Sequence, residues 1–162
     1  MPMLSLKELS GTFAPEDRLL GLDVGAKTIG LALSDTRRTI ASPMKTIRRG
    51  KFTADADTIQ AIAGENGVRA LVIGLPVSMD GTEGPRCQSV RQFAKNLDDA
   101  IGVDYAFWDE RLSTSAVERM LVNEADMTRK RRAEVVDKMA AAYILQGAID
   151  ALKNLAEKTP EE

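Results

Sequence analysis

The sequence of 162 residues contains no histidine and a single cysteine, Cys87. Without histidine there is no imidazole general base, no Ser-His or Cys-His dyad and no histidine-ligated zinc. One cysteine excludes an internal disulfide and a multi-cysteine zinc site, and we expect it to fill a small buried space. Any catalysis must therefore depend on carboxylates, amines, hydroxyls or metal. Carboxylate-rich sites favour hard ions such as Mg²⁺ or Mn²⁺.

Long apolar runs are also missing, since no stretch approaches the roughly 18 residues needed to cross a bilayer. Residues 1–17 are mixed in charge and lack the apolar block of a secretory signal, so we expect a flexible N-terminal extension. The length suits one domain, which we place at 18–155, before an acidic tail at 156–162. These features, with the lone cysteine, predict a cytoplasmic protein with no membrane partner.

Basic residues are clustered although the net charge is only −2. Residues 36–51 hold six cations and no acid after Thr36, and a second basic run comprises Arg129, Lys130, Arg131 and Arg132. Two such segments on a mildly acidic protein indicate contact with phosphates. The alternative is that exposed strand edges and loops carry these charges for solubility.

Hydrophobic patterning predicts the element order β-β-β-α-β-α-β-α-α. The first three strands are joined by short links and should form an antiparallel ribbon, whereas helices separate the later strands and require parallel crossovers. Pro43 suggests that the third strand lies at an edge or carries a bulge. We therefore expect a single α/β domain with one mixed five-stranded sheet flanked by helices. The expected strands are 18–24, 28–34, 39–47, 69–73 and 103–108, and the expected helices are 53–65, 86–100, 115–122 and 133–155.

Acidic residues stand at the ends of two apolar strands. Asp23 lies near the end of the first, between Gly21 and Gly25, where another backbone or a ligand could approach closely. Asp109 and Glu110 end the last strand, and because neighbours point to opposite faces, at most one readily shares a site with Asp23. Alternatively, Asp23 caps a turn and the later acid pairs with a neighbouring arginine.

A third acid, Asp137, heads an apolar stripe of the final helix that continues through Ala141, Ile144 and Ala148. It could instead interact favourably with the positive end of its helix dipole. Like charges that converge at about 4 Å repel by roughly 4 kcal/mol at an effective dielectric near 20, and a divalent cation is the usual remedy.

Four segments resemble the YqgF/RuvX family of ribonuclease-H-like bacterial proteins: GLDVGAKTIGLALSD, VIGLPVSMDGTEGPR, WDERLSTSAVERML and VVDKMAAAYIL. The resemblance covers about residues 19–150, with the four motifs in order. It implies a ribonuclease-H-like fold, a cytoplasmic protein and a nuclease role in maturing the 5′ end of precursor 16S ribosomal RNA. The alternative role that it implies is that of a Holliday junction resolvase. Carried over, the acidic site comprises Asp23, Glu110 and Asp137, with Asp109 the weaker choice.

The resulting hypothesis is hydrolysis of phosphodiester bonds with one or two Mg²⁺ or Mn²⁺ ions held by these three acids. Lys27 could reach a phosphate or be a solvated turn lysine. Arg111 could orient Glu110 or contact the phosphate. Ser113 and Thr114 could bind phosphate or simply cap a helix.

Two competing hypotheses remain. One is a nucleic-acid-binding module that does not cut, and the other is a sugar-kinase-like or actin-like phosphotransferase, because Asp23-Val24-Gly25 followed by Gly30 mimics a phosphate loop. Four phenylalanines, two tyrosines and one tryptophan leave little for stacking on bases, which favours recognition of backbone and shape. Structured RNA, a DNA junction, a monomer and a homodimer all stay open.

Overall fold

The computed structural model describes residues 5–78, 80–110 and 129–158, with the side chains of 129–135 and 156–158 excepted. Five strands form one sheet in the order β3-β2-β1-β4-β5. β1 pairs antiparallel with β2, and β2 with β3, whereas β1–β4 and β4–β5 are parallel. The mixed sheet expected from the sequence is therefore confirmed. The strands are β1 (Arg18–Val24), β2 (Thr28–Ser34), β3 (Ala41–Arg48), β4 (Val68–Leu75) and β5 (Asp104–Asp109).

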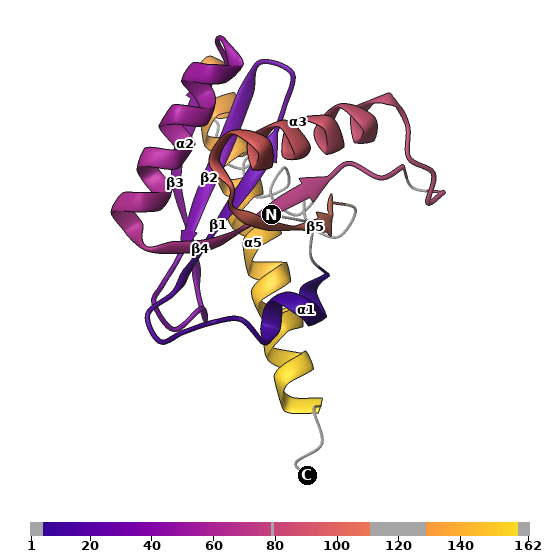
Figure 1. The fold of residues 1–162 in the computed structure, drawn as a ribbon. Coiled ribbons are helices and arrows are strands. Elements are labelled where there is room, and N and C mark those ends of the chain that lie inside the picture. The colour runs from indigo at the N-terminus through magenta and orange to yellow at the C-terminus, as the bar shows by residue number, and fades with distance from the viewer. Residues whose placement is uncertain (1–4, 79, 111–128, 159–162) are drawn as a thin grey trace.

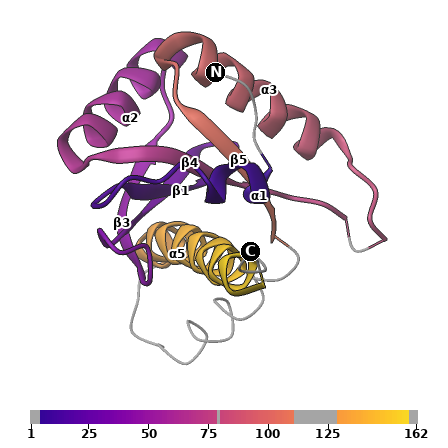
Figure 2. The same cartoon turned by 60° about the horizontal axis from the view of Figure 1, so that its bottom comes forward.

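Helices cover both faces of the sheet. α2 (Phe52–Asn66) and α3 (Pro85–Ile101) lie on one face, and α5 (Arg129–Lys158) crosses the other (Figure 2). Two hydrophobic clusters fill the spaces between these layers. Cys87 is fully buried on the α3 side, as expected. None of the described helices is long and apolar enough to cross a membrane.

Side chains alternate along β1, so successive residues point to opposite faces of the sheet. Leu20, Leu22 and Val24 pack towards α2 and α3, so Gly21 and Asp23 face α5. Small residues line the α5 face of the neighbouring strands as well, among them Gly30, Ala32, Ala70, Gly74 and Ala106. This face allows the helix backbone to approach the sheet closely.

Two glycines show how close the approach is. A Cβ on Gly21 would lie 2.8 Å from the Leu145 Cβ and 2.9 Å from the Ala141 carbonyl oxygen. A Cβ on Gly30 would overlap the carbonyl group of Asp137. The expected stripe of α5 is buried here, because Ala141, Ile144 and Ala148 are all inaccessible. A side chain at either glycine would therefore force a shift of α5 or of the strand.

The N-terminal segment differs from the expectation of a flexible extension. Residues 6–10 form the short helix α1 (Leu6–Ser10), which begins with a capping box between Ser5 and Glu8. Leu9 is fully buried in the cluster under α5, and Figure 1 shows α1 beside that helix. The expectation does not hold for residues 6–10. The spacing of Ser5 and Glu8 is the local signal for this helix, and the contact of Leu9 with α5 stabilises a helix that is too short to form alone.

Smaller differences concern element ends. β3 is an edge strand and its register shifts opposite Ala32, which pairs with Pro43, so the edge or bulge predicted from that proline is confirmed. α5 begins at Arg129 rather than 133, so the run 129–132 belongs to its first turn. The helix expected at 115–122 lies outside the described residues.

Replacing Gly30 with alanine should destabilise the protein, because the added Cβ overlaps the Asp137 backbone and forces α5 to shift. Overpacking of this kind costs about 1–3 kcal/mol, which urea unfolding would measure. Gly64→Ala is the matched control, because a Cβ at this position of α2 meets nothing within 4 Å. It should stabilise the helix by about 0.5–1 kcal/mol. Equal effects of the two changes would contradict the proposed fit of α5.

Candidate active site

Asp23 and Glu110 come together at one end of the sheet. In β5, Tyr105 and Phe107 pack towards α3, whereas Trp108 packs towards α5, so Glu110 continues on the α5 side with Asp23. The side chains of Asp23 and Glu110 are hydrogen-bonded to each other. The structure thus brings Glu110, rather than Asp109, to Asp23.

Gly74 of β4 makes room for Glu110. A Cβ on Gly74 would lie 2.6 Å from the Glu110 Oε1 atom and 2.5 Å from the Ile144 Cδ1 atom. Gly74 lies opposite Trp108 in the pairing of β4 with β5, so Glu110 folds back over the sheet from the end of β5. The carboxylate is consequently held between the sheet and α5 rather than in open solvent.

Burial dominates the electrostatics of this carboxyl pair. Burial, the hydrogen bond to Asp23 and the charge of Asp23 raise the pKa of Glu110 to about 8, while Arg86 opposes the shift. Burial also raises the pKa of Asp23, and the charge of Asp137 adds to this, against the hydrogen bond from Glu110 and the charge of Arg86. Two carboxyl groups that are hydrogen-bonded to each other hold a shared proton near neutral pH.

Asp137 reaches the same end of the sheet from α5. Its carboxylate accepts a hydrogen bond of 2.6 Å from the Thr28 hydroxyl, at the start of β2. Its backbone carbonyl packs on Gly30, which is the residue paired with Asp23 across β1 and β2. Among the described side chains, no three acids, cysteines or histidines are close enough to enclose a metal ion. In this arrangement Asp23 pairs with Glu110, and Asp137 pairs with Thr28.

Cations stand beside the acids. Arg86, in the first turn of α3, lowers the pKa of both Asp23 and Glu110. The sequence analysis missed Arg86, and the available signal was its position at the start of a helix that follows a parallel strand. Lys27 is exposed in the turn between β1 and β2, at the same end of the sheet.

The remaining predicted contacts are not tested by the structure. Arg111, Ser113 and Thr114 lie outside the described residues. The basic run at the start of α5 is placed as helix, but its side chains lie outside the described part of the chain: Arg129, Lys130, Arg131 and Arg132. These residues stay predictions.

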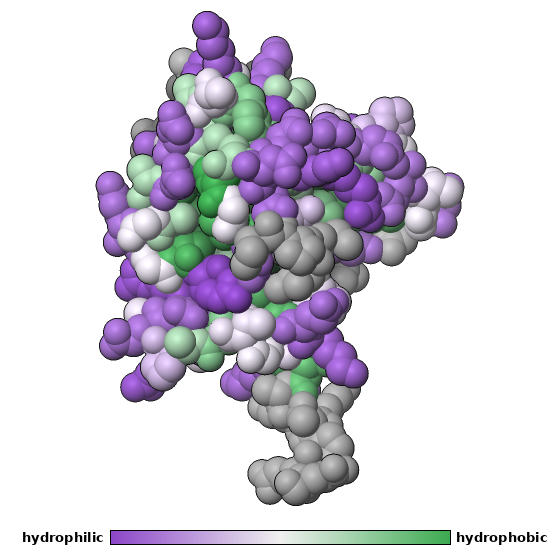
Figure 3. Space-filling model, viewed as in Figure 1, coloured by the Kyte–Doolittle hydropathy of each residue, from purple (hydrophilic) through white to green (hydrophobic). Residues whose placement is uncertain are grey.

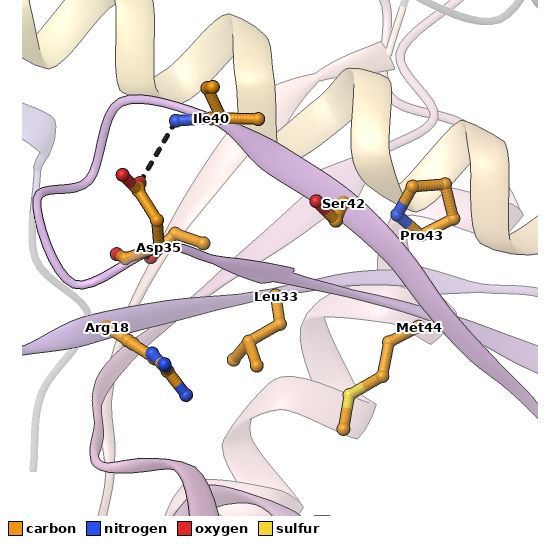
Figure 4. A pocket seen from close by; sticks show the side chains of 8 residues that line it. Arg18, Leu33, Asp35, Ile40, Ser42, Pro43 and Met44 are labelled. Atoms are coloured by element: carbon orange, nitrogen blue, oxygen red, sulfur yellow. Dashed lines mark hydrogen bonds between the residues drawn. The ribbon is translucent and has the colours of Figure 1, made fainter.

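A cavity of about 430 Å³ lies where β1 begins and β2 ends, at the end of these strands away from Asp23 (Figure 4). Asp35 lines it, but its carboxylate accepts hydrogen bonds from the Thr39 hydroxyl and from the backbone N–H groups of Thr39 and Ile40. These bonds lower the pKa of Asp35 to about 2. Asp35 therefore stabilises the loop before β3. This cavity is separate from the Asp23–Glu110 pair, so it is not the candidate active site.

The sheet order, with acids on β1, after β5 and on the crossing helix, defines a ribonuclease-H-like α/β protein. A solved structure with this fold is T. thermophilus RuvC in complex with Holliday junction substrate. It has a TM-score of 0.53 and 12% identity, and the match covers 85% of this chain and 96% of RuvC.

The chain belongs to the RuvX family, whose model, described as "Holliday junction resolvase", matches residues 17–151. A relative from Paramagnetospirillum magneticum is 64% identical over 150 residues, covering 93% of this chain and 96% of that protein. Another from Phenylobacterium zucineum is 56% identical over 159 residues, covering 96% and 100%. Both carry the name "Putative pre-16S rRNA nuclease".

The raised pKa of Glu110 predicts that the protein in EDTA loses stability as pH rises. The folded-state pKa of about 8 exceeds the ordinary value of 4.5, so the folded state binds more protons between these values. The free energy of unfolding should therefore fall from about pH 4.5 to about pH 8, by at most about 1.4 kcal/mol per pH unit for one proton. Urea unfolding across this range would measure it.

Glu110→Gln should flatten this dependence, because the amide cannot titrate. Glu65→Gln, at an exposed position of α2, is the matched control and should retain the wild-type slope. Identical slopes for all three proteins would contradict the shared proton.

Proposed function

We propose that this chain is a metal-dependent nuclease that hydrolyses phosphodiester bonds during 5′-end maturation of precursor 16S ribosomal RNA. The observation that carries the proposal is the half-buried Asp23–Glu110 carboxyl pair, with Asp137 at the same end of the sheet. The names of the relatives, "Putative pre-16S rRNA nuclease", support an RNA substrate for this chain. A role in ribosomal RNA maturation would in turn require a cytoplasmic protein.

The donor set fits a hard divalent ion such as Mg²⁺ or Mn²⁺. It offers carboxylate oxygens and no sulfur or imidazole, which is the chemistry that these ions prefer. A proton shared by Asp23 and Glu110 offsets part of the like-charge repulsion, and a cation would replace it. Asp23, Glu110 and Asp137 would hold one or two ions, which lower the pKa of bound water and neutralise charge on the departing oxygen.

The other described groups would position these acids and the substrate. Thr28 fixes the Asp137 carboxylate through its hydroxyl, and Gly30 sets how closely α5 approaches the sheet. Arg86 offsets part of the negative charge of Asp23 and Glu110, since its charge lowers the pKa of both carboxyl groups. In the reaction a water oxygen bonds to phosphorus, the bond from phosphorus to the departing oxygen breaks, and that oxygen takes up a proton.

Two alternatives differ in substrate or in activity. The description of the family model favours a Holliday junction resolvase, which would use the same acids on branched DNA and would act as a two-fold dimer. A module that binds nucleic acid without cutting it is the second alternative. Membership of the RuvX family argues against the phosphotransferase.

Cleavage of a 5′-extended pre-16S rRNA fragment and of a four-way DNA junction, side by side in Mg²⁺, Mn²⁺ or EDTA, tests the proposal. RNA should be cut in a metal-dependent way, and Asp23→Asn and Asp137→Asn should each reduce the rate by about 100-fold or more. Asp57→Asn, on the exposed side of α2, is the matched control and should retain the wild-type rate.

The other outcomes separate the alternatives. Preferred cutting of the junction would move the function to recombination while keeping the site. Binding of both substrates without cleavage would refute the catalytic role in favour of the binding module. Circular dichroism of each variant shows that a lost rate is not lost folding.

A further inference from the structure

We propose that Arg49 and Arg86 form a subsite that binds a backbone phosphate of the substrate next to the phosphate that is cut. This inference rests on the proposed function, since it assumes a nucleic-acid chain at the carboxyl pair. It assigns the ligand class, a phosphodiester, to a part of the surface that the three acids do not occupy.

The subsite is a small cavity of about 70 Å³ where β1 ends and α3 begins. It is lined by the β1–β2 turn at Gly25 and Ala26, by Arg49 after β3, and by Arg86 and Ser89 of α3. Among these described lining residues none is acidic. Arg49 and Arg86 thus bring two positive charges to the lining of one small cavity, and an anion bound there would offset their mutual repulsion.

Arg49 is held in place before any ligand binds. Its Nη1 atom donates a hydrogen bond of 2.7 Å to the Gly25 carbonyl oxygen. Its guanidinium group lies 5.1 Å from the centre of the Phe93 ring, and its backbone N–H donates to the Lys27 carbonyl oxygen at 2.9 Å. A cation that is already fixed loses little side-chain entropy when it binds a phosphate.

Arg86 links the cavity to the acids. It is exposed in the first turn of α3, and its charge is close enough to lower the pKa of both Asp23 and Glu110. Ser89, one turn further along α3, also lines the cavity and could offer a neutral donor. Hydrophilic residues gather over α3 on the face that Figure 3 shows.

The placement distinguishes this phosphate from the one that is cut. Asp23 faces α5, whereas Val24 and Gly25, the next residues of the chain, line the cavity on the α3 side. A nucleic-acid strand that passes over the end of β1 would present one phosphate to the acids and a neighbouring phosphate to the two arginines.

Another cation of the basic stretch, Arg38, serves the fold instead. Arg38 donates to the Asp17 carbonyl oxygen at 2.6 Å and lies 4.5 Å from the centre of the Phe13 ring. It is close to the N-terminal end of β1, away from Asp23. The basic stretch 36–51 therefore contributes to two places: Arg38 stabilises the fold near the start of β1, and Arg49 lines the proposed subsite.

Binding of a fluorescently labelled 5′-extended pre-16S rRNA fragment, followed by anisotropy in EDTA over a series of salt concentrations, tests the subsite without cleavage. Arg86→Gln should weaken binding about tenfold. It should also reduce the slope of log Kd against log salt by about 0.7–0.9, the value for one lost phosphate contact. Lys95→Gln removes one charge from an exposed position of the same helix and should leave both quantities unchanged.

Arg49→Gln should act in the same direction as Arg86→Gln, and Arg49→Lys should recover part of the affinity because it keeps the charge. Thermal unfolding separates a loss of affinity from a loss of the Phe93 contact. Unchanged affinity and slope in Arg86→Gln, or no metal-independent binding by the wild type, would overturn the subsite. Cleavage in Mg²⁺ is a separate readout, so an inactive protein that keeps these salt slopes would refute the nuclease and retain the subsite.

Discussion

The contact between the α5 backbone and the glycines of the sheet sets the geometry on which the rest of the structure depends. Gly21 and Gly30 let the helix approach until backbone atoms of Ala141 and Asp137 touch the strands. Glycine in a strand sacrifices side-chain packing and conformational entropy, so such positions weaken the sheet by themselves. In exchange, the apolar stripe of α5 is buried, and the backbone of Asp137 lies against Gly30, the residue that pairs with Asp23. Fold and site therefore rely on the same few contacts.

The end of the sheet separates charges of opposite sign. Asp23 and Glu110 lie on the α5 side, hydrogen-bonded to each other, and Asp137 is held there by Thr28. Cations occupy the α3 side, where Arg49 and Arg86 line one cavity. An acidic cluster alone would repel nucleic acid, and a basic cluster alone would bind it without positioning one bond. With both at one edge, the arginines can attract the chain while the acids remain available to a divalent ion.

The sequence predicted the sheet well because strand alternation and short links constrain pairing strongly. It also predicted the buried stripe of α5 from Asp137 to Ala148. The choice between Asp109 and Glu110 followed from the resemblance, whereas in the structure it follows from which face Trp108 occupies. Helix α1 was missed although Ser5 and Glu8 have capping-box spacing, because five residues show too little apolar periodicity to indicate a helix and Leu9 is buried by a helix far away in the chain. Arg86 was missed although it begins the helix that follows a parallel strand, because the acids beside it lie on β1 and after β5, far away in the chain.

The use of the aromatic rings bears on how a nucleic acid is recognised. Phe13 lies against Arg38, Phe93 against Arg49, and Phe107 against Arg91. Phe52 packs edge-on against Phe93, and Tyr105 packs edge-on against Phe107. Among the described residues the phenylalanine rings thus orient arginines or fill the core, and Phe93 holds one of the two arginines of the proposed subsite. Rings engaged in this way do not offer their faces to bases. Selection of a substrate would then depend on where its phosphates lie in space, which is a property of shape shared by folded RNA and branched DNA.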